Sequence, residues 1–216
     1  MDTKARSVIP LHSEDAQAAA LEAARGDFYA LLAVLLLQAP SVDFLDELGR
    51  ANSLLPLHAA EGELTRQWER LVLAAALMEA DSVQDEYDML FAGPSDPLLN
   101  PHASVYLSGF LMDKPLAALR AELGQLGLSR VDGVRQLEDH LGALMETMRV
   151  LIMRGDSLAT QRHFFERHIA CWAGRATEDM RRAEGANFYR AVADFLDAFL
   201  AIEAEAFAMA DYGEQV

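Results

Sequence analysis

Apolar residues recur along the chain at steps of three and four, the spacing that places side chains on one face of an α-helix. One stripe runs from Val134 to Ile152 and ends before Gly155, and a second runs from Phe188 to Phe207. β-Branched and polar residues never alternate over the length of a strand. The pattern therefore predicts an all-α fold, a helical bundle of about eight to ten helices.

Capping residues and helix breakers set the expected boundaries of the other helices. Ser41 and Ser157 are in N-capping positions, and Pro115 and Gly127 bracket one helix at its start and end. The helices expected from these signals are 14–39, a short one after residue 41, 63–80 followed by a turn over 82–91, 115–126, 157–172 and 177–183.

Two irregular connectors interrupt the helical pattern. The longer one, Gly93 to Ala103, reads GPSDPLLNPHA, and its three prolines prevent a helix from continuing through it. Connectors of this length in compact domains tend to be functional. The second break, at 127–133, predicts two lobes, 13–127 with the proline-rich loop 93–103, and 134–210.

The composition indicates a globular protein with a core of its own. The chain has 216 residues, of which 52% are hydrophobic, with 13 glycines and 7 prolines. No apolar run approaches the roughly 20 residues of a membrane-spanning helix, and the first residues lack the apolar centre of an export signal. A single cysteine, Cys171, excludes an intramolecular disulfide. We therefore expect a cytoplasmic protein without stable membrane insertion.

The chain is strongly acidic, with 34 Asp and Glu residues against 18 Lys and Arg residues and a net charge of −16. This charge disfavours nucleic acid and favours cationic partners, although it is equally consistent with a role in solubility alone. The sequence contains no phosphate-binding loop, dinucleotide fingerprint, Cys-x-x-Cys pair, nucleophile elbow or Glu-x-x-His metal motif. We expect no catalytic residues, no metal and no cofactor.

Three further stretches are distinctive: YDMLFAGPSDPLLNPHASVY, from Tyr87 to Tyr106, the acidic segment Glu138–Leu141 with its Asp-His pair, and the aromatic pattern from Phe164 to the end of the last stripe. All three resemble the TorD and DmsD type of redox enzyme maturation chaperone, and the first is the most specific. The resemblance extends from about the first expected helix to residue 205, and it implies a TorD-like all-helical fold.

The resemblance also implies a function. Proteins of this family bind the twin-arginine leader, the body, or both, of the apo catalytic subunit of a molybdopterin-dependent oxidoreductase, and delay export until the cofactor is inserted. Two alternatives stay open: an assembly chaperone for a non-exported subunit of the respiratory nitrate reductase type, and a helical enzyme or small-molecule-binding protein that uses Tyr106, Asp139 and His140. A homodimer is a further expectation at the level of the family.

The expected peptide-binding site is an apolar groove rimmed by carboxylates, because a leader combines a cationic head with an apolar middle. Its candidate residues are Tyr87, Leu90, Phe91, Gly93, Pro94, Pro101, Ser104, Tyr106, Asp139 and His140. Core packing is the competing role for Leu90 and Phe91. Ser104 is expected to cap the following helix. Asp139 either stabilises a helix N-terminus or pairs with a leader arginine, and His140 orients that arginine or contacts the peptide.

Overall fold

The computed structural model describes residues 12–51, 62–92, 97–131, 133 and 135–213, and within these ranges it has ten α-helices and no β-strand. The predicted all-α fold is therefore confirmed. The helices are α1 (His12–Leu37), α2 (Val42–Gly49), α3 (Glu63–Leu77), α4 (Ala80–Tyr87), α5 (Ala103–Ser108), α6 (Lys114–Gln125), α7 (Leu141–Met153), α8 (Leu158–Phe165), α9 (Ala173–Arg182) and α10 (Phe188–Gly213), with two short π-helices, η1 (Asp88–Ala92) and η2 (Glu166–Ala170).

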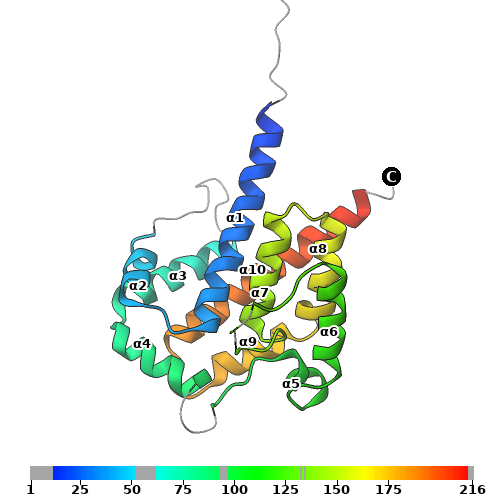
Figure 1. Ribbon diagram of the computed structural model, residues 1–216. Coiled ribbons are helices and arrows are strands. Elements are labelled where there is room, and N and C mark those ends of the chain that lie inside the picture. The colour runs from blue at the N-terminus through cyan, green and yellow to red at the C-terminus, as the bar shows by residue number, and fades with distance from the viewer. Residues whose placement is uncertain (1–11, 52–61, 93–96, 132, 134, 214–216) are drawn as a thin grey trace, which may run out of the picture.

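Helices α1 and α10 organise the bundle. Helix α1 packs along α7, and α10 packs against α3 and α9. Helices α2, α3 and α4 lie on one side of α1, and α5, α6 and α8 lie on the other (Figure 1). No helix in the described ranges is long and apolar enough to cross a membrane.

The core is rich in aromatic side chains, as the last stripe predicts. Phe28 of α1, Trp68 of α3, and Phe195 and Phe199 of α10 are buried, with the Phe28 ring centroid 5.3 to 5.7 Å from the other three. The tilted and edge-on ring arrangements are those that aromatic pairs prefer. The contacts of α1 with α7 and of α3 with α10 join residues before and after the break at 127–133. The division into two lobes stays a prediction.

Several helix starts confirm the capping signals. The hydroxyls of Ser41 and Ser157 accept hydrogen bonds from the backbone N–H groups of Phe44 and Thr160, both at 3.2 Å. Pro115 lies in the first turn of α6, and Gly127 follows that helix with a φ of 68°. These residues act locally, so a short stretch of sequence is enough to recognise them.

Other boundaries differ from the prediction. Helix α3 ends at Leu77 rather than at residue 80. Helix α9 starts at Ala173, four residues before Thr177, whose hydroxyl donates to Gly174 O inside the helix. Helix α7 starts at Leu141, so the helix predicted from residue 134 is wrong for 135–140, which are not helical.

Glu86 links α4 to α10 through a carboxylate cap. Its two carboxylate oxygens accept the backbone N–H groups of Asn187, Phe188 and Tyr189 at 2.9, 3.1 and 2.7 Å. These N–H groups have no partner inside the helix, and a buried carboxylate at a helix N-terminus satisfies them and complements the helix dipole. The Tyr189 hydroxyl donates to Leu35 O at 3.1 Å, which extends the link to α1.

We predict that Glu86→Gln lowers the free energy of unfolding by about 1 to 3 kcal/mol, because hydrogen bonds to a charged group are stronger than those to a neutral amide. Urea unfolding followed by far-ultraviolet circular dichroism measures the change. Glu69→Gln is the matched control, since Glu69 is exposed and has no hydrogen bond or ion pair among the described residues. Equal losses in both variants would show that the cap contributes no stability.

Candidate functional site

Two segments that are distant in the sequence pair through their backbones and form the centre of the candidate site. Ala103 N donates to Asp139 O at 2.9 Å, and Leu141 N donates to Pro101 O at 2.8 Å. His102 and His140 thereby form an isolated antiparallel β-bridge. The end of the proline-rich loop and the Asp-His pair, both singled out in the sequence, therefore lie side by side.

Asp139 is fully buried and caps α5 from outside that helix. Its Oδ2 accepts from Ser104 N at 2.9 Å and from the Ser104 hydroxyl. The expectation that Ser104 caps this helix is wrong: α5 begins at Ala103, and Ser104 is a donor to the capping carboxylate. Because Asp139 has no exposed surface, it is not positioned to meet an arginine arriving from solution. Its Oδ1 has no hydrogen-bond partner among the described residues.

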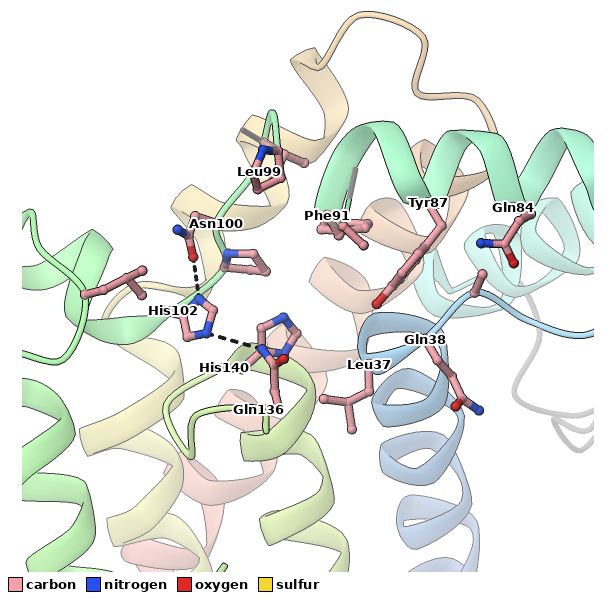
Figure 2. A pocket seen from close by; sticks show the side chains of 15 residues that line it. Leu37, Gln38, Gln84, Tyr87, Phe91, Leu99, Asn100, His102, Gln136 and His140 are labelled. Atoms are coloured by element: carbon pink, nitrogen blue, oxygen red, sulfur yellow. Dashed lines mark hydrogen bonds between the residues drawn. The ribbon is translucent and has the colours of Figure 1, made fainter. Parts of the chain in front are cut away.

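A first cavity of about 680 Å³ lies beside this pairing. Tyr87 and Phe91 approach it from α4 and η1, and His102, Gln136 and His140 lie on the opposite side (Figure 2). The lining combines apolar side chains, four side-chain amides and two imidazoles, without any Asp, Glu, Lys or Arg. It consists of Leu37, Gln38, Ala39, Gln84, Tyr87, Phe91, Ala92, Pro97, Leu99, Asn100, Pro101, His102, Leu111, Gln136 and His140.

Hydrogen bonds determine which nitrogen of each imidazole carries the proton. His140 Nδ1 accepts from Gly142 N at 3.1 Å, so the proton of the neutral ring lies on Nε2. Asn100 Oδ1 can only accept, so His102 Nδ1 donates to it, and His102 Nε2 accepts from the Gln136 amide at 3.2 Å. The two rings contact each other edge to face, with their centroids 4.9 Å apart.

Both imidazoles are held in the neutral form. Burial, and after it the repulsion that a charged His140 would meet from a protonated His102, lowers the pKa of His140 to about 3. Burial also lowers the pKa of His102, although the Asp139 carboxylate acts in the opposite direction. Protonating either buried ring would cost desolvation free energy, and the surrounding side chains do not offset that cost. The first cavity therefore carries no formal charge at neutral pH.

A second cavity, of about 1080 Å³, shares Leu99 and Asn100 with the first and is lined by charged residues of α9. Tyr106 forms part of its wall: the hydroxyl donates to Asp179 Oδ2 at 2.8 Å, and the ring lies on Trp172 at a centroid distance of 5.2 Å. Burial, assisted by Asp179, raises the pKa of Tyr106. The Arg175 guanidinium lies 5.7 Å from the centre of the same ring.

Some charged side chains of the second cavity form ion pairs, and others do not. Arg182 and Glu178 form an ion pair at 2.6 Å. Asp179 and Glu184 are exposed carboxylates that line the cavity and have no ion-pair partner in the part of the chain that the structure describes. Carboxylates therefore line the second cavity, and none lines the first.

The structure divides the residues predicted for the site into three groups. Tyr87, Phe91, Pro101 and His140 line the first cavity, and Tyr106 lines the second. Leu90, Ser104 and Asp139 are buried and line neither, which confirms the core role for Leu90. Gly93 and Pro94 lie outside the described residues.

Sequence reasoning did not identify the amides of Gln38, Gln84 and Gln136, or the carboxylates of Asp179 and Glu184. None of these residues belongs to a motif with a recognisable spacing. Gln136 lies two residues before the acidic segment Glu138–Leu141, which is the one indirect signal that could have pointed to it. Among the described residues, no group of three or more His, Cys, Asp or Glu side chains is arranged to hold a metal ion.

We predict that the stability of the protein falls as the pH drops below about 6.5, partly because of His140. Its folded pKa, about 3, lies below the unfolded value of about 6.5. The unfolded chain therefore binds the proton first, and stability is complete above pH 6.5 and decreases on acidification. His140→Asn keeps a helix-capping side chain and removes the titration. Between pH 6.5 and 5.0 the variant should lose about 2 kcal/mol less than the wild type in urea unfolding. Parallel losses would contradict the assignment.

Two comparisons with known proteins found similar sequences. Residues 57–178 match a family model described as nitrate reductase delta subunit. Over 177 residues the chain is 26% identical to the chaperone protein TorD of Vibrio parahaemolyticus serotype O3:K6, a match that covers 74% of this chain and 78% of the relative. The range matched by the family model contains both paired segments and the part of α4 and η1 that lines the first cavity.

Proposed function

The chain belongs to the nitrate reductase delta subunit family, which includes the TorD-type chaperones of molybdoenzyme maturation, and we propose that it binds the twin-arginine leader of an apo catalytic subunit. In this role it keeps a molybdopterin-dependent oxidoreductase subunit from export until the cofactor is inserted. The place of action is the cytoplasm, and the chaperone itself catalyses no reaction and holds no cofactor.

One observation supports this proposal above all: two cavities of different chemistry adjoin at Leu99 and Asn100. An export leader has a positively charged head followed by an apolar stretch. The uncharged first cavity suits the apolar stretch. The carboxylates of Asp179 and Glu184, which form no ion pair among the described residues, suit the positive head. The net charge of −16 adds a field that attracts such a peptide from a distance.

The predicted site residues take different parts in this proposal. Tyr87, Phe91 and Pro101 contact the apolar stretch, and Tyr106 forms the wall beside the cationic head. Asp139 is a positioning residue, because it holds the end of the loop and the start of α7 in place without reaching a cavity. Roles for Gly93 and Pro94, and the homodimer, stay predictions.

A second client class has one observation in its favour. The matching family model is described by a nitrate reductase subunit, which suggests a non-exported catalytic subunit of that type as the partner. Such a client would be bound without a cleaved leader. Affinity purification of the full chain from its own cells, followed by identification of the bound catalytic subunit, distinguishes the two clients.

We predict that the leader encoded beside this gene binds the full chain with micromolar or tighter affinity in titration calorimetry. The double variant Asp179→Asn and Glu184→Gln should bind about threefold to tenfold more weakly, because each exposed ion pair contributes up to about 1 kcal/mol. Added salt should reduce the difference.

The matched control is Glu47→Gln with Glu69→Gln, which changes the net charge equally at exposed positions that line neither cavity. If the control pair weakens binding as much as the site pair, the second cavity is not the place of the cationic head. If the wild-type chain gives no heat with the leader, the proposed function is rejected.

A further inference from the structure

The first cavity is lined by both hydrogen-bond donors and hydrogen-bond acceptors that have no partner among the described residues. The Gln38 amide has no hydrogen bond to the described residues. Gln84 donates from its amide nitrogen to Asp88, and Gln136 donates from its nitrogen to His102, so neither carbonyl oxygen has a hydrogen-bond partner among the described residues. The oxygen of Asn100 accepts from His102, and its NH₂ group donates to none of the described residues.

Two further donors belong to the same lining. The Tyr87 hydroxyl has no hydrogen-bond partner among the described residues, and Figure 2 shows Tyr87 pointing toward the cavity. His140 carries its proton on Nε2, which none of the described residues accepts. The free groups therefore include at least three acceptor oxygens and at least three donors, set among apolar side chains such as Leu37 and Phe91.

The chemistry of these groups matches a peptide backbone better than it matches charged side chains. A side-chain amide presents one carbonyl and one NH₂, the same groups that a backbone presents as C=O and N–H. The lining contains no charged residue, although 24% of the chain is charged. A charge carried into this cavity would lose water without gaining a counter-charge.

The conformation of the bound peptide decides whether its backbone N–H and C=O groups bond to each other or to the cavity. A helix satisfies its own N–H and C=O groups internally, so its backbone would make no hydrogen bonds to the side-chain amides of the cavity. An extended segment has free backbone groups, and alternate residues direct them to opposite sides. Main-chain hydrogen bonds supply affinity in other proteins that bind extended peptides.

We infer that the first cavity binds the uncharged part of the client peptide in an extended conformation, with Gln38, Gln84, Asn100 and Gln136 hydrogen-bonded to its backbone. This inference rests on the proposed function and adds a mode of recognition to it. Backbone recognition depends little on side-chain identity, so the cavity accepts apolar stretches of varied sequence and leaves selectivity to other contacts.

A backbone N-methylation scan tests this mode directly. Synthetic copies of the leader encoded beside this gene carry one N-methyl group each, at successive residues of the apolar stretch, and are titrated into the full chain by calorimetry. Each methyl group removes one N–H donor. In an extended peptide the affinity should fall about tenfold at every second residue and little at the residues between. Methylation in the cationic head is the internal control.

Variants of the protein supply an independent readout. Gln38 and Gln84 are exposed, so the variants Gln38→Leu and Gln84→Leu should fold normally. Each should lower the affinity for the unmodified leader about threefold to tenfold. Gln125→Leu on α6 is the matched control, because Gln125 is exposed and lines neither cavity. Circular dichroism verifies the fold of all three.

The outcomes separate this inference from the proposed function. Loss of affinity with a two-residue period, together with weakening by both cavity variants, supports extended binding. Equal losses at consecutive residues, or tighter binding of a helix-stabilised leader, would overturn the inference while leaving leader recognition intact. Absence of heat with the unmodified leader and the wild-type chain would reject the proposed function and the inference with it.

Discussion

The candidate site depends on four hydrogen bonds that join residues 101–104 to residues 139–141. Two are backbone bonds, and two end on the buried Asp139 carboxylate. A carboxylate buried away from water makes strong charge-assisted bonds, and losing one leaves an unpaired group at high cost. Asp139 therefore fixes the position of the loop end relative to α7 more firmly than apolar packing would.

The hydrogen bonds at Asp139 come with a cost in stability. Asp139 Oδ1 is buried without a hydrogen-bond partner among the described residues, and two imidazoles are held neutral beside it. A core selected for stability alone would replace these groups with apolar side chains. Their presence at the wall of the cavity is typical of a functional site, where local stability is given up for a defined arrangement of polar groups.

The sequence predicted the parts of the fold that are determined locally. Helical periodicity and the caps at Ser41 and Ser157 identified the class and many of the helix starts. The start of α7 was missed because apolar spacing continues from Leu137 into that helix, while 135–140 instead pairs with a segment about 35 residues earlier. Such pairing leaves no periodic signal in either segment. The resemblance located both segments, but only the coordinates show that they meet and which side chains face the cavities.

The π-helix η1 gives the loop its second attachment. Leu90 O accepts from Leu99 N at 2.8 Å, and Met89 O accepts from Leu98 N at 3.4 Å. The stretch from Leu90 to Leu99 is thus a ring closed by its own backbone, and its far end is held again at Pro101. Lengthening such a ring costs only about 0.6 kcal/mol for each doubling. Insertions between Ala92 and Leu98 therefore cost little stability, because η1 and the Leu98–Leu99 segment keep the backbone hydrogen bonds that join them.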